Sequence, residues 1–262
     1  MVQRLAVGVE YDGTLYKGWQ KQKKHPTVQS ELEKALAKIA EHPIHTICAG
    51  RTDTGVHAIG QVIHCDVQLS RKTDNWLFGA NTYLPKDIRI LWVKKVSQDF
   101  NARKTAINRR YCYIIYNHPI RPSLLRHQLT WCCRDLTVSK MQLAVQHWIG
   151  KHDFSSFRAA DCQSSTSIRV VKSIEITRMR EIVIIDIIAN AFLHHMLRNM
   201  VGVLLSIGKG KIVPEEALTI LKAKDRTAAG ITAPPNGLYL TKVEYPTDLN
   251  LPKANSLLWF LN

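Results

Sequence analysis

The chain is organised around the decapeptide AGRTDTGVHA at residues 49–58. The runs at residues 44–48 and 59–67 on either side are rich in Ile and Val, which favour β-strands. The decapeptide itself contains two glycines among polar residues, a composition typical of turns. It is therefore predicted to be a polar loop joining two strands, a place where rigid scaffolds commonly hold binding and catalytic residues.

Asp53 is the carboxylate of this loop, two residues after Arg51 and four before His57. A guanidinium so close favours the ionised carboxylate, which suits a nucleophile or general base better than a general acid. Gly50 and Gly55 permit a tight backbone around it. The same residues also suit an Asx-type turn, in which Asp53 only caps backbone N–H groups. The pattern leaves both interpretations open.

The residues around the loop predict a β-α-β-β-α-β unit. A strand pattern at residues 2–11 ends at an Asp-Gly turn, and helical spacing begins near residue 28. After the two strands that flank the loop, a second helix is predicted over residues 73–84 and a strand over residues 88–96. This order is typical of a ferredoxin-like fold.

A similar rhythm restarts after residue 105. The predicted elements are a strand at 110–116, a helix at 138–149, a hairpin at 169–177 and 182–189, a helix at 192–207, a helix after Pro214 and a strand at 237–245. We therefore expect an α+β protein with two ferredoxin-like or RRM-like halves, residues 1–105 and 106–262. Mainly antiparallel sheets should flank a central basic cleft.

Charge indicates the partner. Lys and Arg number 36 against 21 Asp and Glu, a formal net charge of +15. Such an excess favours a polyanion, most often nucleic acid, although a merely basic soluble protein has the same composition. The chain lacks the roughly 18-residue apolar run that a membrane span needs. We expect no membrane association and a cytoplasmic protein.

Cofactor motifs are missing from the sequence. The six cysteines show no C-x-x-C spacing and the histidines no H-x-x-x-H register, so no metal site is expected. Neither a G-x-G-x-x-G segment after a strand nor a P-loop occurs, so no nucleotide cofactor is expected.

Two further segments carry candidate binding residues. Tyr111 and Tyr113 share one face of a predicted strand, where they could form a platform for a nucleobase or pack in the core. The predicted helix at 192–207 has one apolar side, formed by Leu193, Met196, Leu197, Met200 and Leu204. A second side is either a solvated face or a surface that lets a substrate or strand approach, and it holds His195, Arg198, Asn199 and Gly202.

Several blocks, in order along nearly the whole chain, resemble the TruA family of tRNA pseudouridine synthases. The central decapeptide resembles the catalytic block of that family, which usually has Ala where this chain has Thr54. The other matching blocks are YDGT at 11–14, GWQ at 18–20, TVQ at 27–29, FNAR at 100–103, HDF at 152–154, the segment 192–202 and APPNGLYL at 233–240. The resemblance implies the pseudouridine synthase fold.

The resemblance also implies roles for single residues. Asp53 would be the essential catalytic aspartate and Arg51 would help to displace the target nucleotide from its stack. Tyr111 would stack on the uracil, Arg198 would pair with Asp53, and Leu238 would pack against the base.

Beyond the active site, the resemblance implies an RNA-binding segment formed by Phe100, Asn101, Ala102, Arg103 and Lys104. It further implies a homodimer that acts without cofactor on uridines 38, 39 and 40 of the tRNA anticodon stem-loop. We expect the Thr54 difference to be tolerated. The alternative interpretation is a non-catalytic protein that binds or folds RNA, supported by charge and aromatic residues alone.

Overall fold

The computed structural model describes residues 2–252 of the chain. They form two compact units, the first containing residues up to Arg109 and those from Tyr239 on, the second Arg110–Leu238. The expected division into 1–105 and 106–262 stays a prediction. The two compact units differ from it because the last strand belongs with the N-terminal residues, where it pairs with a strand of the first unit.

The first unit has the β-α-β-β-α-β order that the sequence predicts. Its elements are β1 (Gln3–Tyr11), α1 (Val28–Ala40), β2 (Ile47–Cys48), β3 (His57–Val67), α2 (Thr73–Tyr83), β4 (Ile88–Val96) and most of β10 (Leu238–Glu244). β1 is central and pairs antiparallel with β3 and β4. On the edge that faces away from β1, β3 pairs antiparallel with β2 and parallel with β10.

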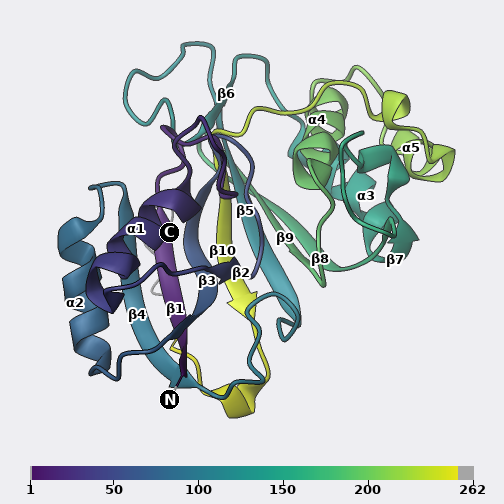
Figure 1. Cartoon of the computed structure of the whole chain (residues 1–262). Helices are drawn as coiled ribbons and strands as arrows, with labels where there is room; N and C mark the ends of the chain where they lie inside the picture. Colours follow the sequence, from purple (N-terminus) through teal and green to yellow (C-terminus); the bar gives the residue numbers. More distant parts are fainter. Residues whose placement is uncertain (1, 253–262) are drawn as a thin grey trace. The chain divides into compact units, whose positions relative to one another are not determined.

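The two helices of the first unit pack on its sheet (Figure 1). α1 begins at a capping box, in which Thr27 accepts from the backbone of Ser30 and the Ser30 hydroxyl accepts from Thr27. Its apolar side buries Leu32 and Leu36, and α2 buries Trp76. Complete burial of such side chains is worth about 1.5–3 kcal/mol each, so this layer fixes the sheet that carries the central loop.

The second unit is also α+β. Its elements are β5 (Asn108–Asn117, whose first two residues belong to the first unit), β6 (Thr130–Cys132), α3 (Val138–Val145), β7 (Gly150–Asp153), β8 (Ile168–Met179), β9 (Ile182–Ala189), α4 (Met196–Gly208) and α5 (Glu216–Ala223). Its strands lie in the order β5-β9-β8-β7, with β6 parallel to β5. The predicted hairpin is the antiparallel β8–β9 pair, and α3 contacts α4, α5 and β8.

Three elements are clearly shorter than predicted. The helix expected at 192–207 starts only at Met196, because His195 has a left-handed backbone with φ 60°. The helix expected at 138–149 ends at Val145 and continues as a 3-10 turn. The strand expected at 44–48 is reduced to Ile47–Cys48.

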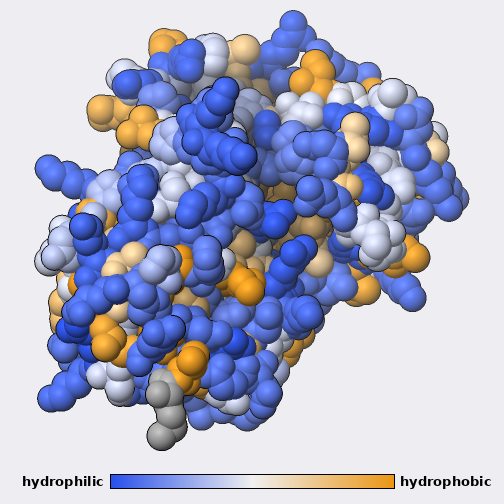
Figure 2. All heavy atoms as spheres, viewed as in Figure 1, coloured by the Kyte–Doolittle hydropathy of each residue, from blue (hydrophilic) through white to orange (hydrophobic). Residues whose placement is uncertain are grey.

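The α+β class with mainly antiparallel strands is confirmed. Within residues 2–252, no helix combines the length and the hydrophobicity of a membrane span. On the face shown in Figure 2, hydrophilic residues predominate and hydrophobic ones form small separate groups. The expected basic cleft stays a prediction.

Candidate active site

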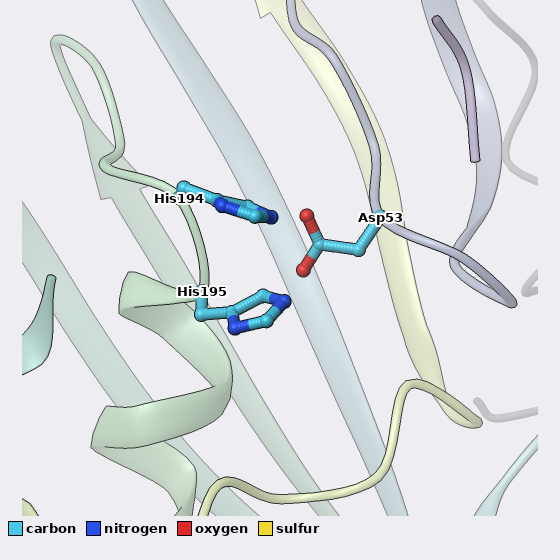
Figure 3. A group of neighbouring side chains, drawn as sticks. All are labelled: Asp53, His194 and His195. Carbon is cyan, nitrogen blue, oxygen red and sulfur yellow. The ribbon is translucent and has the colours of Figure 1, made fainter. Parts of the chain in front are cut away.

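The central loop joins β2 to β3 and alternates between buried and exposed residues. Thr52 is 6% exposed and His57 2% exposed, so both belong to the core of the first unit. Arg51 and Thr54 are exposed, and Asp53 is half-buried. Figure 3 shows the Asp53 side chain leaving this loop shortly before β3. The loop therefore turns its chemically capable groups outward and uses the residues between them as anchors.

Buried polar groups hold the inner side of the loop. The Tyr11 hydroxyl lies 2.7 Å from Oγ1 of Thr52, and the Trp19 backbone N–H donates to the Thr52 carbonyl at 3.0 Å. The Gln61 side-chain amide donates to the Gly50 carbonyl at 2.7 Å. Because buried hydrogen-bonding groups are costly to leave unpaired, these contacts stabilise this conformation of the loop.

Arg109 anchors the start of the loop. Arg109 is 8% exposed, and its guanidinium donates to three backbone carbonyls, those of Ala49 at 3.0 Å, Ala106 at 3.1 Å and Arg103 at 2.6 Å. A planar guanidinium with several fixed donors suits such a bridge better than a lysine. Arg109 thus ties the central loop to the segment that contains Arg103.

The Asp12-Gly13-Thr14 turn supports the end of the loop. Nδ1 of His57 lies 3.1 Å from both an Asp12 carboxylate oxygen and the Gly13 nitrogen. The Gly13 N–H donates to this nitrogen. Burial opposes ionisation of Asp12, but its contact with His57 and its hydrogen bonds from Thr14 outweigh burial and hold the pKa of this carboxyl below its ordinary value. His57 also stacks on Tyr239, with ring centroids 4.8 Å apart.

The Cys48 thiol is not a candidate nucleophile, although it stands immediately before the loop. Cys48 is 7% exposed, and burial raises the pKa of its thiol to about 12. The thiol is therefore protonated at neutral pH, whereas a nucleophilic cysteine reacts as the thiolate. Asp53 remains the candidate reactive group of this loop.

The segment expected to bind RNA contains both buried and exposed residues. Phe100 and Ala102 are 2% and 0% exposed, so their side chains belong to the core. Arg103 and Lys104 are exposed, and the side chain of Asn101 accepts from both of their backbone N–H groups at 3.0 Å. Within this segment only Arg103 and Lys104 expose cationic side chains that could meet a phosphate backbone, and the expected RNA contact stays a prediction.

In the second unit, Tyr111 and Tyr113 have different surroundings. Tyr113 is 1% exposed, and its hydroxyl lies 2.6 Å from Oγ1 of Thr130 and 2.8 Å from the Pro234 carbonyl oxygen, which confirms the core interpretation for this residue. Tyr111 is 7% exposed and meets the ring of Phe192 edge to face at 5.0 Å. Its role as a stacking platform stays a prediction.

The polar side of α4 is partly buried. Asn199 is 0% exposed, donates to the Phe157 carbonyl at 2.8 Å and accepts from Thr232 at 2.7 Å, so the interpretation as a solvated face is wrong for this residue. At Gly202 an added Cβ would lie 1.9 Å from the Ile231 carbonyl oxygen. The expected close approach to this glycine is thus made by the chain itself.

Arg198 and Leu238 are held in the second unit by the segment that joins α5 to β10. Nε of Arg198 donates to the Ala233 carbonyl at 2.9 Å, and the Ala233 N–H donates to the Arg198 carbonyl at 3.0 Å. Leu238 is 4% exposed at the start of β10. His194 and His195, labelled in Figure 3, stand at the turn before α4, and Nδ1 of His194 lies 2.8 Å from the Asp161 carboxylate.

Sequence reasoning missed the residues that support the central loop from inside, namely Tyr11, Gln61 and Arg109. Gln61 and Arg109 carry a weak signal, because each is a polar residue in a strand that is otherwise largely buried. Tyr11 carries none, because a tyrosine at the end of a strand pattern fits ordinary core packing.

Comparisons with known proteins agree on one family. A family model described as tRNA pseudouridine synthase matches residues 8–103 and 144–246. A tRNA pseudouridine synthase A of Coxiella burnetii (strain Dugway 5J108-111) is 54% identical over 250 residues, 95% of this chain and 96% of the relative. One of Colwellia psychrerythraea (strain 34H / ATCC BAA-681) is 49% identical over 251 residues, 96% and 97% of the two chains.

A solved structure of a Cbf5-Nop10-Gar1 complex is 12% identical with a TM-score of 0.38, covering 90% of this chain and 48% of that chain, a likeness too weak to carry an argument. The family model and the relatives suffice without it. This chain belongs to the tRNA pseudouridine synthase family.

Proposed function

We propose that the protein converts uridine to pseudouridine at positions 38, 39 and 40 of the tRNA anticodon stem-loop, without cofactor. The observation that carries the proposal is the central loop, which holds Asp53 and Arg51 on its outer side while their neighbours are anchored in the core. Family membership and the net charge of +15 support an RNA substrate.

The chemistry needs little more than a well-placed carboxylate. The N1–C1′ bond of uridine breaks, the uracil turns, and C5 bonds to C1′; C5 loses a proton and N1 gains one. No atom is oxidised and no group is imported. Carboxylates stabilise or capture an electron-poor anomeric carbon in glycoside hydrolysis. Attack of Asp53 on C1′, its attack on C6 and its removal of a sugar proton all satisfy this balance.

The target uridine must leave its stack before it can react, at a cost of about a few kcal/mol. The exposed side chain of Arg51 is suited to offset this cost by binding the displaced nucleotide. We assign Tyr111 to stacking on the uracil, Leu238 to packing against the base and Arg198 to pairing with Asp53. These assignments follow the resemblance of their sequence blocks to the family.

The same resemblance supports a homodimer in the cytoplasm. Sedimentation velocity of the purified protein should give a species of twice the chain mass at micromolar concentration. A monomer throughout the concentration range, with and without tRNA, would overturn the proposed dimer and leave the proposed chemistry intact.

Position-specific mapping tests the proposed substrate. The protein is incubated with an unmodified tRNA transcript that has uridines at 38, 39 and 40, and pseudouridines are located in the nuclease fragments. We expect conversion at these three positions and none in a transcript with cytidines there. Conversion elsewhere would contradict the assigned positions, and tRNA binding with unchanged nucleosides would favour a non-catalytic RNA-binding protein.

A further inference from the structure

Gly50 is the first residue of the central loop that lies beyond the backbone hydrogen bonds between β2 and β3. A side chain holds it instead of the backbone of a neighbouring strand. Ile47 and Cys48 pair with His64 and Ile63, and the Ala49 N–H still donates to the Val62 carbonyl at 2.8 Å. Gly50 therefore stands opposite Gln61, where the next pair of the ladder would form.

Opposite Gly50, the side-chain amide of Gln61 makes the hydrogen bonds that the backbone of a neighbouring strand would otherwise make. Its amide nitrogen donates to the Gly50 carbonyl at 2.7 Å, and its amide oxygen accepts from the Gly50 N–H at 3.4 Å. A primary amide presents one donor and one acceptor side by side, as a peptide in a neighbouring strand does. Gln61 is 0% exposed, so water does not compete for these groups.

The same amide reaches the next inward-facing residue of the loop. Its nitrogen lies 3.4 Å from the Tyr11 hydroxyl, which is 2.7 Å from Oγ1 of Thr52. One buried network thus holds residues 50 and 52 from the inside. Residues 51 and 53 alternate with them and turn outward.

We infer that Gln61 is a positioning residue for the reaction, which sets the backbone of Gly50 and thereby the place of Arg51 and Asp53. The inference rests on the proposed catalytic role of Asp53. Without the amide, the Gly50 carbonyl loses its partner and the peptide before Arg51 is free to rotate. A displacement of about 1 Å in a catalytic group can cost about 100-fold in rate.

Gln61→Met tests this inference because methionine keeps the length of the side chain and removes its hydrogen bonds to Gly50 and to the Tyr11 hydroxyl. Under single turnover, with tRNA labelled with tritium at uridine C5, we expect the rate of tritium release to fall about 10- to 100-fold. The dissociation constant for tRNA should not change, because Gln61 is buried. Tyr11→Phe, which removes only the hydroxyl, should give a smaller loss of the same kind.

Gln29→Met is the matched control for destabilisation. Gln29 lies in the same unit, is 9% exposed, and its amide donates to Glu33 and to the Thr46 carbonyl, but not to the central loop. We expect this variant to lower the melting temperature as Gln61→Met does and to keep the single-turnover rate of the folded protein.

Equal rates for Gln61→Met and Gln29→Met, at equal folded fractions, would overturn the inference. A loss of tRNA affinity with an unchanged rate would overturn it too. Asp53→Asn, measured in the same assay, distinguishes a failure of the catalytic role of Asp53 from a failure of the positioning role of Gln61. If that variant is active, the proposed role of Asp53 fails; if it is inactive while Gln61→Met is normal, only the positioning role fails.

Discussion

At the scale of single residues, the central loop depends on close backbone contacts that leave no room for side chains. At Gly13 an added Cβ would lie 2.0 Å from the Val56 carbonyl oxygen, and at Gly18, where φ is 83°, it would lie 2.8 Å from that of Thr52. These two glycines let the N-terminal segment lie directly on the loop. Their close contacts with the loop account for the glycines in the blocks at 11–14 and 18–20.

Gly13→Ala should therefore destabilise the protein and lower its activity. The methyl group must displace the Val56 backbone, and strain of this kind costs about 1–3 kcal/mol. Urea denaturation measures the loss in free energy of unfolding. Gly79→Ala is the control, because its Cβ would meet only the end of the Ile39 side chain within a helix, and we expect little change there. A Gly13→Ala protein as stable as the control would contradict the contact.

The loop between two strands could be predicted from the sequence, because residue types and glycine spacing within ten residues carry the signal, whereas the roles of Asp53 and Arg51 stay predictions. Gln61 and Arg109 could not be assigned in this way. Their partners Gly50 and Ala49 lie 11 and 60 residues away along the chain, so the contacts arise only from tertiary folding.

At the scale of secondary-structure elements, periodicity predicted the long helices and strands well and their ends less well. The apolar side of α4 is confirmed, since Met196, Leu197 and Met200 are each 5% exposed or less. Its start was wrong because a left-handed backbone at His195 has no signal in hydrophobic spacing. β6 and β7 were missed because strands of three and four residues are too short to show alternation.

His64 makes the segment at 100–104 sensitive to pH. Nδ1 of His64, which is 4% exposed, accepts from the Ala102 N–H at 3.1 Å. Burial, and then the charge of Arg4, lower the pKa of His64 from its ordinary value of 6.5, while Asp66 opposes them. The folded protein thus binds this proton less readily than the unfolded chain. The contribution to stability is complete above about pH 6.5 and is lost as the pH falls below it.

Hydrogen exchange at the Ala102 amide measures this effect. We expect its protection to decrease between about pH 6.5 and 5 relative to amides in the centre of β1, after correction for intrinsic rates. His64→Asn should remove the pH dependence, because the amide oxygen can accept the same hydrogen bond and does not titrate. A pH dependence that persists in His64→Asn would assign the effect to another group.

At the scale of the whole molecule, charge sets the strength of RNA binding. With a net charge of +15, the protein should release counterions when it binds tRNA. The dissociation constant should rise about 10-fold or more between roughly 50 and 200 mM salt. Filter binding at several salt concentrations gives the slope. Arg103→Gln should reduce this slope by the amount that corresponds to about one phosphate contact. An unchanged slope would exclude contact between this exposed cation and a phosphate.

The pairing of β10 was also beyond sequence reasoning. The pattern at 237–245 predicted a strand, but not that Tyr239 and Leu240 pair with His57 and Ala58 of β3. This pairing places the C-terminal strand of the described chain beside the last residue of the central loop. Strand partners so distant in the sequence leave no trace in local periodicity.

The most direct test of the central claim is tritium release from tRNA labelled at uridine C5, measured with Asp53→Asn. The exchange removes the charge of the carboxylate and keeps its size. We predict that release falls by about 10⁴-fold or more, as for other essential catalytic residues, while tRNA binding and the melting temperature stay near those of the unchanged protein. Release at the original rate would show that Asp53 does not carry the reaction.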